Sequence, residues 1–471
     1  KLLKGRLGKH AAPDGRGGTW NAAGDIVFSP GYRDPLWRVP SSGGEPVQVT
    51  RLDAARNEET HRYPRFLPDG RHFLFLARVR GQGRGEQTAI YVGSLDSEER
   101  QLLFHVDSNA AYVSGHLLFV RDRTLMAQPF DPDRLEFTAD AVPLAESVRF
   151  DQAYSRGIFS VSDNGVLVYQ TGRGQTNTQL AMFDGTGEKL DAVGETGDYP
   201  DISLSRDGGR AALSIVDPTS SNWDIWLHDM ARNVRTRFTF DASIDCCAAW
   251  SPDGTFLVFS SDRKGHFDLY RKDADGSGTA EILYESEGDV FHPSISPDGR
   301  WIIYTYTAAG SATKFDLWAL PVEQPGDPVP IVRTDFQEGW GDFSPDGKWI
   351  AYTSDESGRE EVYIMPFPEP GGKWQVTTAG GTQPRWKKDQ TGVFFLAPTG
   401  EMMIAPVTVR DERVEVGDPR SLFGMERGAS IFRVYDVAAD GTRFLINTAV
   451  EQQAGSPLTL VVNWTADLQR D

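Results

Sequence analysis

The sequence predicts an all-β fold of about ten four-stranded antiparallel sheets, on three observations. The turn tetrapeptide Ser-Pro-Asp-Gly stands at 251–254, 296–299 and 344–347, and altered copies occur elsewhere. The residue four places before the end of each copy is apolar throughout. The last residues of the copies recur about every 46 residues, at Gly24, Gly70, Gly115, Gly165, Gly208, Gly254, Gly299, Gly347, Gln390 and Gly441. Such a period, with several short strands in each copy, is typical of a β-propeller.

The first strand of each copy ends just before the turn. Side chains alternate between the two faces of a strand, so an apolar residue at one fixed place marks an inward position. That place holds Trp20, Phe66, Ala111, Val161, Leu204, Trp250, Ile295, Phe343, Trp386 and Val437. Asp-Gly then provides a tight hairpin turn, because glycine tolerates positive φ and aspartate hydrogen-bonds to its own backbone.

Three further strands follow each turn. The second and third are short runs of β-branched and aromatic residues, such as 256–259 and 268–270 in one copy. The fourth, as at 374–377, is more polar, which suits an outer edge that faces water. Each copy therefore reads as one four-stranded sheet of a propeller.

We expect one closed ring over residues 1–471, in which residues 2–7 complete the last sheet. The alternative is two propellers in tandem, residues 1–180 with repeats one to four and residues 181–471 with repeats five to ten. The chain begins at Lys1 without an initiator methionine or an apolar leader, so we expect that a segment precedes it.

Composition limits the partners. The chain of 471 residues has 48 Lys and Arg against 67 Asp and Glu, a formal net charge of −19. Its charges are scattered, so no basic stripe is present to neutralise nucleic-acid phosphates or an anionic membrane. Eighteen consecutive apolar residues occur nowhere, so we expect no membrane insertion by this segment.

A variable position predicts a binding surface. The residues seven places before the turn ends differ in chemistry from copy to copy, although the apolar position beside them is uniform. Because propeller ligands meet the strands where the channel opens, we expect a ligand site at the channel mouth. Its candidate residues are Tyr63, Asp201, Cys247, His292, Trp340 and Gln383.

The strongest repeats, 250–254, 295–299 and 343–347, resemble the PD40 repeats of TolB-like β-propellers, which are related to WD40 repeats. Segments 261–270 and 355–386 look like the extracytoplasmic propellers of bacterial receptor-like serine/threonine kinases, although the sequence contains no kinase motif. The resemblance implies a periplasmic or extracytoplasmic sensor or scaffold that binds a protein or an envelope-derived ligand. Fold alone does not determine function, so the ligand stays open.

The sequence lacks several motifs that are typical of enzymes. The sequence has no Gly-x-Ser-x-Gly, His-Glu-x-x-His or P-loop motif, so we favour a non-enzymatic binding protein without a cofactor. The alternative is a metal-dependent polysaccharide lyase or hydrolase with its site in the channel. A divalent metal would then be held by His61, His292 and Gln383, a grouping that resembles PD40-type oligogalacturonate lyases.

Cys246 and Cys247 are adjacent. Neighbouring Cα atoms lie about 3.8 Å apart, which is less than a relaxed disulfide spans. We therefore expect two buried thiols rather than a disulfide.

Overall fold

Strands supply nearly all of the regular structure in the computed structural model, which confirms the all-β prediction. The structure describes residues 16–465 except 32, 80–86, 152–153, 163, 172–177, 218–221, 309–314, 323–325, 370, 411–412, 426–431, 439 and 451–457. A short 3₁₀ helix, η2 (Ala54–Arg56), interrupts the strands. No helix within these described ranges is long and apolar enough to span a bilayer.

The chain divides into two compact units. Unit 1 contains residues 1–174 and 453–471, and unit 2 contains residues 175–452. This division differs from the single ring expected over residues 1–471. The first change of unit lies near the boundary at 180 and 181 that the two-propeller alternative gave, but the chain returns to unit 1 at its end. The proposed closing segment, residues 2–7, lies outside the described residues.

The described part of unit 2 contains six antiparallel sheets. Five of them are built from strands that are consecutive in sequence. In the fifth of these sheets, the last two strands both pair with the third strand. The five sheets are β20 (Asp201–Leu204), β21 (Arg210–Val216), β22 (Trp223–Asp229) and β23 (Val234–Arg237); β24 (Asp245–Trp250), β25 (Phe256–Ser261), β26 (Asp268–Asp273) and β27 (Glu281–Tyr284); β28 (Asp289–Ile295), β29 (Trp301–Thr307), β30 (Asp316–Pro321) and β31 (Val329–Val332); β32 (Glu338–Phe343), β33 (Trp349–Ser354), β34 (Glu361–Pro366) and β35 (Trp374–Gln375); and β36 (Thr382–Trp386), β37 (Gly392–Leu396), β38 (Glu401–Arg410), β39 (Arg413–Val416) and β40 (Arg420–Gly424).

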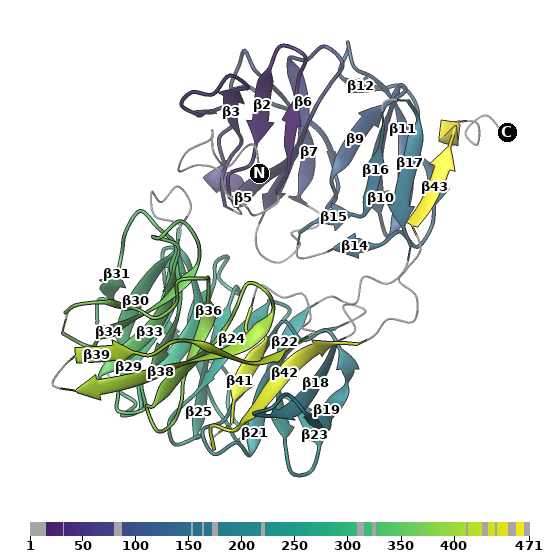
Figure 1. Cartoon of the computed structure of the whole chain (residues 1–471). Helices are drawn as coiled ribbons and strands as arrows, with labels where there is room; N and C mark the ends of the chain where they lie inside the picture. The colour runs from purple at the N-terminus through teal and green to yellow at the C-terminus, as the bar shows by residue number, and fades with distance from the viewer. Residues whose placement is uncertain are drawn as a thin grey trace. The chain divides into compact units, whose positions relative to one another are not determined.

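The sixth sheet joins the two ends of unit 2, and we call it the closing sheet. From outside to inside its order is β19 (Lys189–Gly197), β18 (Thr178–Asp184), β42 (Arg443–Ala449) and β41 (Tyr435–Val437). β18 pairs antiparallel with β42 over seven residue pairs, from Thr178 opposite Ala449 to Asp184 opposite Arg443. Figure 1 shows this pairing as a yellow strand beside a teal one. Segments about 260 residues apart in sequence thus share one sheet.

Unit 1 contains the remaining sheets. β43 (Leu458–Val462), from the end of the chain, pairs with β17 and completes the sheet that starts with β16. The other strands of unit 1 are β1 (Gly18–Trp20), β2 (Asp25–Phe28), β3 (Trp37–Pro40) and β4 (Val47–Gln48); β5 (Glu58–Phe66), β6 (His72–Val79), β7 (Ala89–Ser94) and β8 (Gln101–His105); β9 (Ala110–Val113), β10 (His116–Arg121), β11 (Thr124–Asp131), β12 (Glu136–Phe137) and β13 (Val142–Ala145); β14 (Phe150–Asp151) and β15 (Arg156–Gly157); and β16 (Phe159–Val161) and β17 (Val166–Gln170).

Apolar clusters link each sheet of unit 2 to the next. In order, they include Leu445 with Ile202, Ile225 with Leu257, Val258 with Ile302, Ile303 with Ile350, Ala351 with Val393, and Phe394 with Phe444. The last pair returns to the closing sheet, so the six contacts form a cycle. Each fully buried aromatic or aliphatic side chain contributes about 2–3 kcal/mol, and such clusters hold the sheets together.

The predicted turns and inward positions are present with one exception. All ten turn-end residues have positive φ, including the non-glycine Gln390 at 60°. Positive φ is the conformation that the Asp-Gly turns require. Trp20, however, is 62% exposed on β1, while Trp250 and Trp386 at the same repeat position are buried. The apolar residue at position 20 therefore does not mark an inward side chain.

Candidate functional site

The first strands of four sheets in unit 2 carry a repeated backbone irregularity. Cys247, His292, Trp340 and Gln383 each have positive φ, between 51° and 58°. The pairing register of β24, β28, β32 and β36 with the next strand shifts at these same places, as in a β-bulge. Positive φ is uncommon for residues other than glycine, and such conformations cluster at functional sites. Four sequence-predicted site residues therefore share one special conformation.

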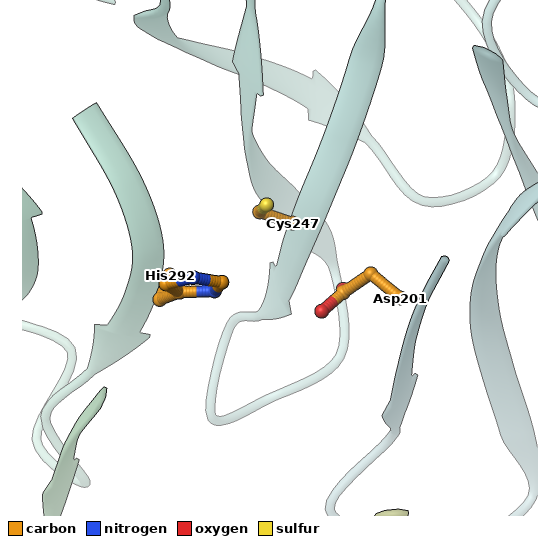
Figure 2. A group of neighbouring side chains, drawn as sticks. All are labelled: Asp201, Cys247 and His292. Atoms are coloured by element: carbon orange, nitrogen blue, oxygen red, sulfur yellow. The ribbon is translucent and has the colours of Figure 1, made fainter. Parts of the chain in front are cut away.

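Three of the predicted residues lie together. One potential ligand atom from each of Asp201, Cys247 and His292 lies within 4.8 Å of the other two. The side chains come from β20, β24 and β28 and extend into the same space (Figure 2). All three residues are buried, at 1%, 2% and 9% exposure. The sequence position seven places before the turn thus does converge in space within unit 2.

Trp340 extends the group to the next sheet. Its ring stacks on the His292 ring with centroids 3.7 Å apart and planes 25° from parallel. A small cavity of about 10 Å³, enough for the centre of about one water molecule, adjoins these rings. It is lined by His292, Trp340, Gly341, Gln383, Pro384, Arg385, Arg433 and Tyr435.

Gln383 connects β36 to the segment that leads into the closing sheet. Its side-chain amide donates to the carbonyl of Phe432 at 3.0 Å and accepts from the N–H of Val434 at 3.2 Å. The Tyr435 hydroxyl donates to the carbonyl of Gln383 at 2.6 Å. These bonds join β36 to the segment that enters the closing sheet. Gln383 is thus engaged with the protein's own backbone.

Ion pairs reinforce the same junction. Arg385 contacts Asp342 at 3.0 Å and Asp436 at 3.1 Å, so one guanidinium joins three sheets. Burial by itself would lower the pKa of Arg385, but these two carboxylates hold it above its usual value. Asp342 and Asp436 also accept backbone N–H groups from Trp386 and Leu204, at 2.9 and 2.8 Å. Two carboxylates two residues after the variable position therefore bond to the neighbouring sheet in the same way.

Asp201 closes the other side of the junction. Its carboxylate accepts the backbone N–H of Arg433 at 3.1 Å, across 232 residues of sequence. Burial raises the pKa of Asp201 to about 6, against the opposing effect of the Arg433 charge. Burial, together with the positive charges of Arg433 and Arg385, places the pKa of His292 well below its usual value. His292 is therefore neutral at pH 7.

The two cysteines are free thiols, as expected. Both are buried, and their sulfur atoms lie 3.1 Å apart. Burial, and then the neighbouring Cys247 thiol, raise the pKa of Cys246 well above its usual value. Cys246 is therefore an uncharged thiol at neutral pH.

Tyr63 and His61 belong to unit 1. Tyr63 has a φ of 54°, like its counterparts in unit 2, and its hydroxyl donates to the carbonyl of Tyr154 at 2.7 Å. Nδ1 of the buried His61 lies 2.8 Å from the Thr50 hydroxyl, and Nε2 lies 3.2 Å from Glu58. The metal ligands of the enzymatic alternative, His61, His292 and Gln383, thus come from two units, and His61 and Gln383 make other contacts.

The charged residues of the junction were not among the site residues predicted from the sequence. Asp342, Arg385 and Asp436 each lie five places before a turn end in three consecutive repeats. Charges of opposite sign at one repeated position, on the same strand face as the variable residues, could have identified them.

Gln383→Ala tests the junction. We expect this change to lower the free energy of unfolding of unit 2 by about 2–4 kcal/mol, because it removes both the acceptor of the buried Val434 N–H and the amide that donates to the Phe432 carbonyl. Urea denaturation measures the loss. Gln375→Ala, on the outer strand β35, removes one amide bond to Thr377 and should cost under about 1 kcal/mol. Equal losses in the two variants would contradict a joining role.

A pH series tests the ion cluster of unit 1. Burial by itself would raise the pKa of Glu58, but hydrogen bonds from His61, Arg100 and the backbone of Asp53 lower it from 4.5 to about 2. As the pH falls, the unfolded chain therefore protonates Glu58 at a higher pH than the folded chain does. The stability contributed by the ionised Glu58 is complete above pH 4.5 and is lost as the pH falls toward 2. Glu58→Gln should therefore reduce stability by about 3 kcal/mol at pH 7 and by less at pH 3.5.

Urea denaturation at the two pH values measures both numbers, and Glu98→Gln is the control. Glu98 pairs with Arg51 while both side chains are mainly exposed, so its change should be small at either pH. A loss of unfolding free energy in Glu58→Gln that grows as the pH falls would contradict a stabilising role for the ionised Glu58 carboxylate.

Comparison with known proteins gives a family match in unit 2. Residues 202–323 match the family model PD40, described as the TolB beta propeller domain. A stretch of 135 residues, 28% of this chain, is 30% identical to the Tol-Pal system protein TolB of Wolinella succinogenes. This stretch corresponds to only 30% of the length of that relative.

Two solved structures are also similar. A putative TolB from Agrobacterium tumefaciens shares 18% identity with a TM-score of 0.47, over 58% of this chain and 98% of that one. An oligogalacturonate lyase in complex with manganese shares 13% identity with a TM-score of 0.40, over 65% of this chain and 81% of that one. The PD40 match confirms that the sheets of residues 202–323 are TolB-like propeller repeats.

Proposed function

We propose that unit 2 is a non-enzymatic binding module of the cell envelope, which holds a protein or an envelope-derived ligand at the mouth of its channel. The observation that carries this proposal is the His292–Trp340 stack, held by two residues with positive φ at the inner strands. Backbone strain of this kind costs about 1–3 kcal/mol at each residue, and residues held in such conformations cluster at functional sites.

Trp340 is the side chain best suited to contact a ligand. Asp201 and Gln383 are committed to backbone groups of the junction, and Cys247 is fully buried. Trp340 is only partly buried, and its indole ring is fixed by the stack on His292. Rigid tryptophan side chains of this kind supply much of the binding energy at protein interfaces.

A location outside the cytoplasm is part of the proposal. It is supported by the likeness to a Tol-Pal system protein and by the TolB propeller match. A role as the sensor domain of a kinase rests only on the sequence resemblance, and it stays a hypothesis.

An enzymatic alternative also stays open. A metal-dependent lyase or hydrolase acting in the channel would draw on the buried Nδ1 of His292, which has no hydrogen-bond partner among the described residues. Such an enzyme would need a bound metal.

Trp340→Ala tests the binding role. The purified chain is incubated with envelope extract of the source bacterium, and bound species are quantified by mass spectrometry for wild type, Trp340→Ala and Phe240→Ala. We expect a specific species whose affinity falls at least about tenfold with Trp340→Ala, because a central tryptophan contributes about 2 kcal/mol or more. Phe240 is 67% exposed and lies beyond β23, so its variant should bind as wild type does.

Two results would contradict the proposal. One is equal capture of every species by wild type and Trp340→Ala. The other is equal loss of capture in Phe240→Ala, which would indicate nonspecific adhesion through exposed aromatic rings. Circular dichroism of each variant establishes that the fold is retained.

A further inference from the structure

We propose that Asp201, Cys247 and His292 form a binding site for a borderline-soft divalent cation, with zinc as its best-fitting member. The three residues offer a carboxylate oxygen, a sulfur and a ring nitrogen, all within 4.8 Å of one another. These are the three ligand types found in protein zinc sites. Figure 2 shows that they approach one another from three different strands.

The spacing suits such an ion after a small contraction. Zinc lies about 2.0–2.3 Å from its ligands in a tetrahedral site, which puts the ligand atoms about 3.5 Å apart. No two of these ligand atoms are therefore more than about 1.3 Å farther apart than in an occupied site. Side-chain rotation can supply this difference while the strands stay in place.

His292 supplies an independent indication. Its Nδ1 is buried and makes no hydrogen bond within the described part of the chain. A buried polar atom without a partner costs about 1–3 kcal/mol, so native proteins rarely retain one without a reason. The rings of Trp340 and Phe432 contact the His292 ring and fix its orientation.

The surrounding charges are compatible with a bound cation. Three carboxylates, those of Asp201, Asp342 and Asp436, lie near the guanidinium groups of Arg385 and Arg433. With all three carboxylates ionised, this set has one excess negative charge. A divalent cation bound to Cys247 as the thiolate would make the set neutral, which removes the cost of an uncompensated buried charge.

Three protein ligands leave one coordination position open. Sites of this kind complete the tetrahedron with water or with a group of the bound ligand. His292 also lines the 10 Å³ cavity beside Trp340, which has room for about one water molecule.

Cobalt(II) is the probe for the test, because its thiolate complexes absorb in the near ultraviolet and its tetrahedral complexes absorb visibly. The full chain is reduced, treated with EDTA and titrated with Co²⁺, and Zn²⁺ affinity is measured by competition. We expect one equivalent of Co²⁺ with a thiolate absorption band. Cys247→Ser should abolish the band and weaken Zn²⁺ binding at least about tenfold, whereas the matched control Cys246→Ser should retain both.

Asp201→Asn and Phe240→Ala complete the design. Asparagine can still accept the N–H of Arg433, so Asp201→Asn should keep the fold and weaken metal binding at least about tenfold. Phe240 is 67% exposed and lies beyond β23, so Phe240→Ala should still bind one equivalent of Co²⁺. Thermal unfolding shows which variants keep the fold; if Cys247→Ser does not, Asp201→Asn tests the site, with Cys246→Ser as its control.

The proposal is overturned if wild type binds no stoichiometric Co²⁺ or binds it without a thiolate band. Equal effects of Cys246→Ser and Cys247→Ser would also overturn it. The inference does not depend on the proposed binding function. A wild-type chain that captures a ligand but binds no Co²⁺ refutes the metal site alone. A wild-type chain that binds Co²⁺ but captures no ligand refutes the binding role alone.

Discussion

The closing sheet is the feature on which unit 2 depends. Its two outer strands come from the beginning of the unit and its two inner strands from the end, through the pairing of β18 with β42. Buried polar groups then fasten this sheet to both neighbours: Gln383 and Arg385 on the β36 side, and Asp201, which accepts a hydrogen bond from Arg433, on the β20 side. Hydrophobic packing alone is nondirectional, whereas these bonds specify which sheets meet.

The same junction shapes the candidate site. Because the amide of Gln383 and one carboxylate oxygen of Asp201 bond to the backbone, fewer polar atoms at the inner strands are free for a ligand than the sequence suggests. The remaining groups are the other oxygen of Asp201 and the side chains of Cys247, His292 and Trp340. The last three residues have positive φ, and the rings of His292 and Trp340 stack. The residues that join the closing sheet to its neighbours and the residues of the candidate site therefore lie on the same strands. A change in the junction is expected to affect the site, and a change in the site is expected to affect the junction.

The repeat made much of this structure predictable. Turn residues such as Gly254 and Gln390 have the positive φ expected of them, and the variable position does bring Asp201, Cys247 and His292 together. The crossing of two strands could not be foreseen: β18 follows β17 in sequence but pairs with β42, and β43 follows β42 but pairs with β17. The apolar pattern of a strand does not show which other strand it joins. Trp20 shows the same limit, since an apolar residue at the right spacing is exposed on β1.

Cross-linking tests the closing sheet most directly. In a variant with Cys246 and Cys247 both changed to serine, one cysteine pair replaces Gln179 and Thr448, which face each other on β18 and β42. A second variant pairs Thr448→Cys with Thr459→Cys, as a sheet formed from consecutive strands would require. We expect a disulfide between 179 and 448, identified by peptide mapping under mild oxidation, and little between 448 and 459. Efficient cross-linking of 448 to 459 with none to 179 would contradict the account.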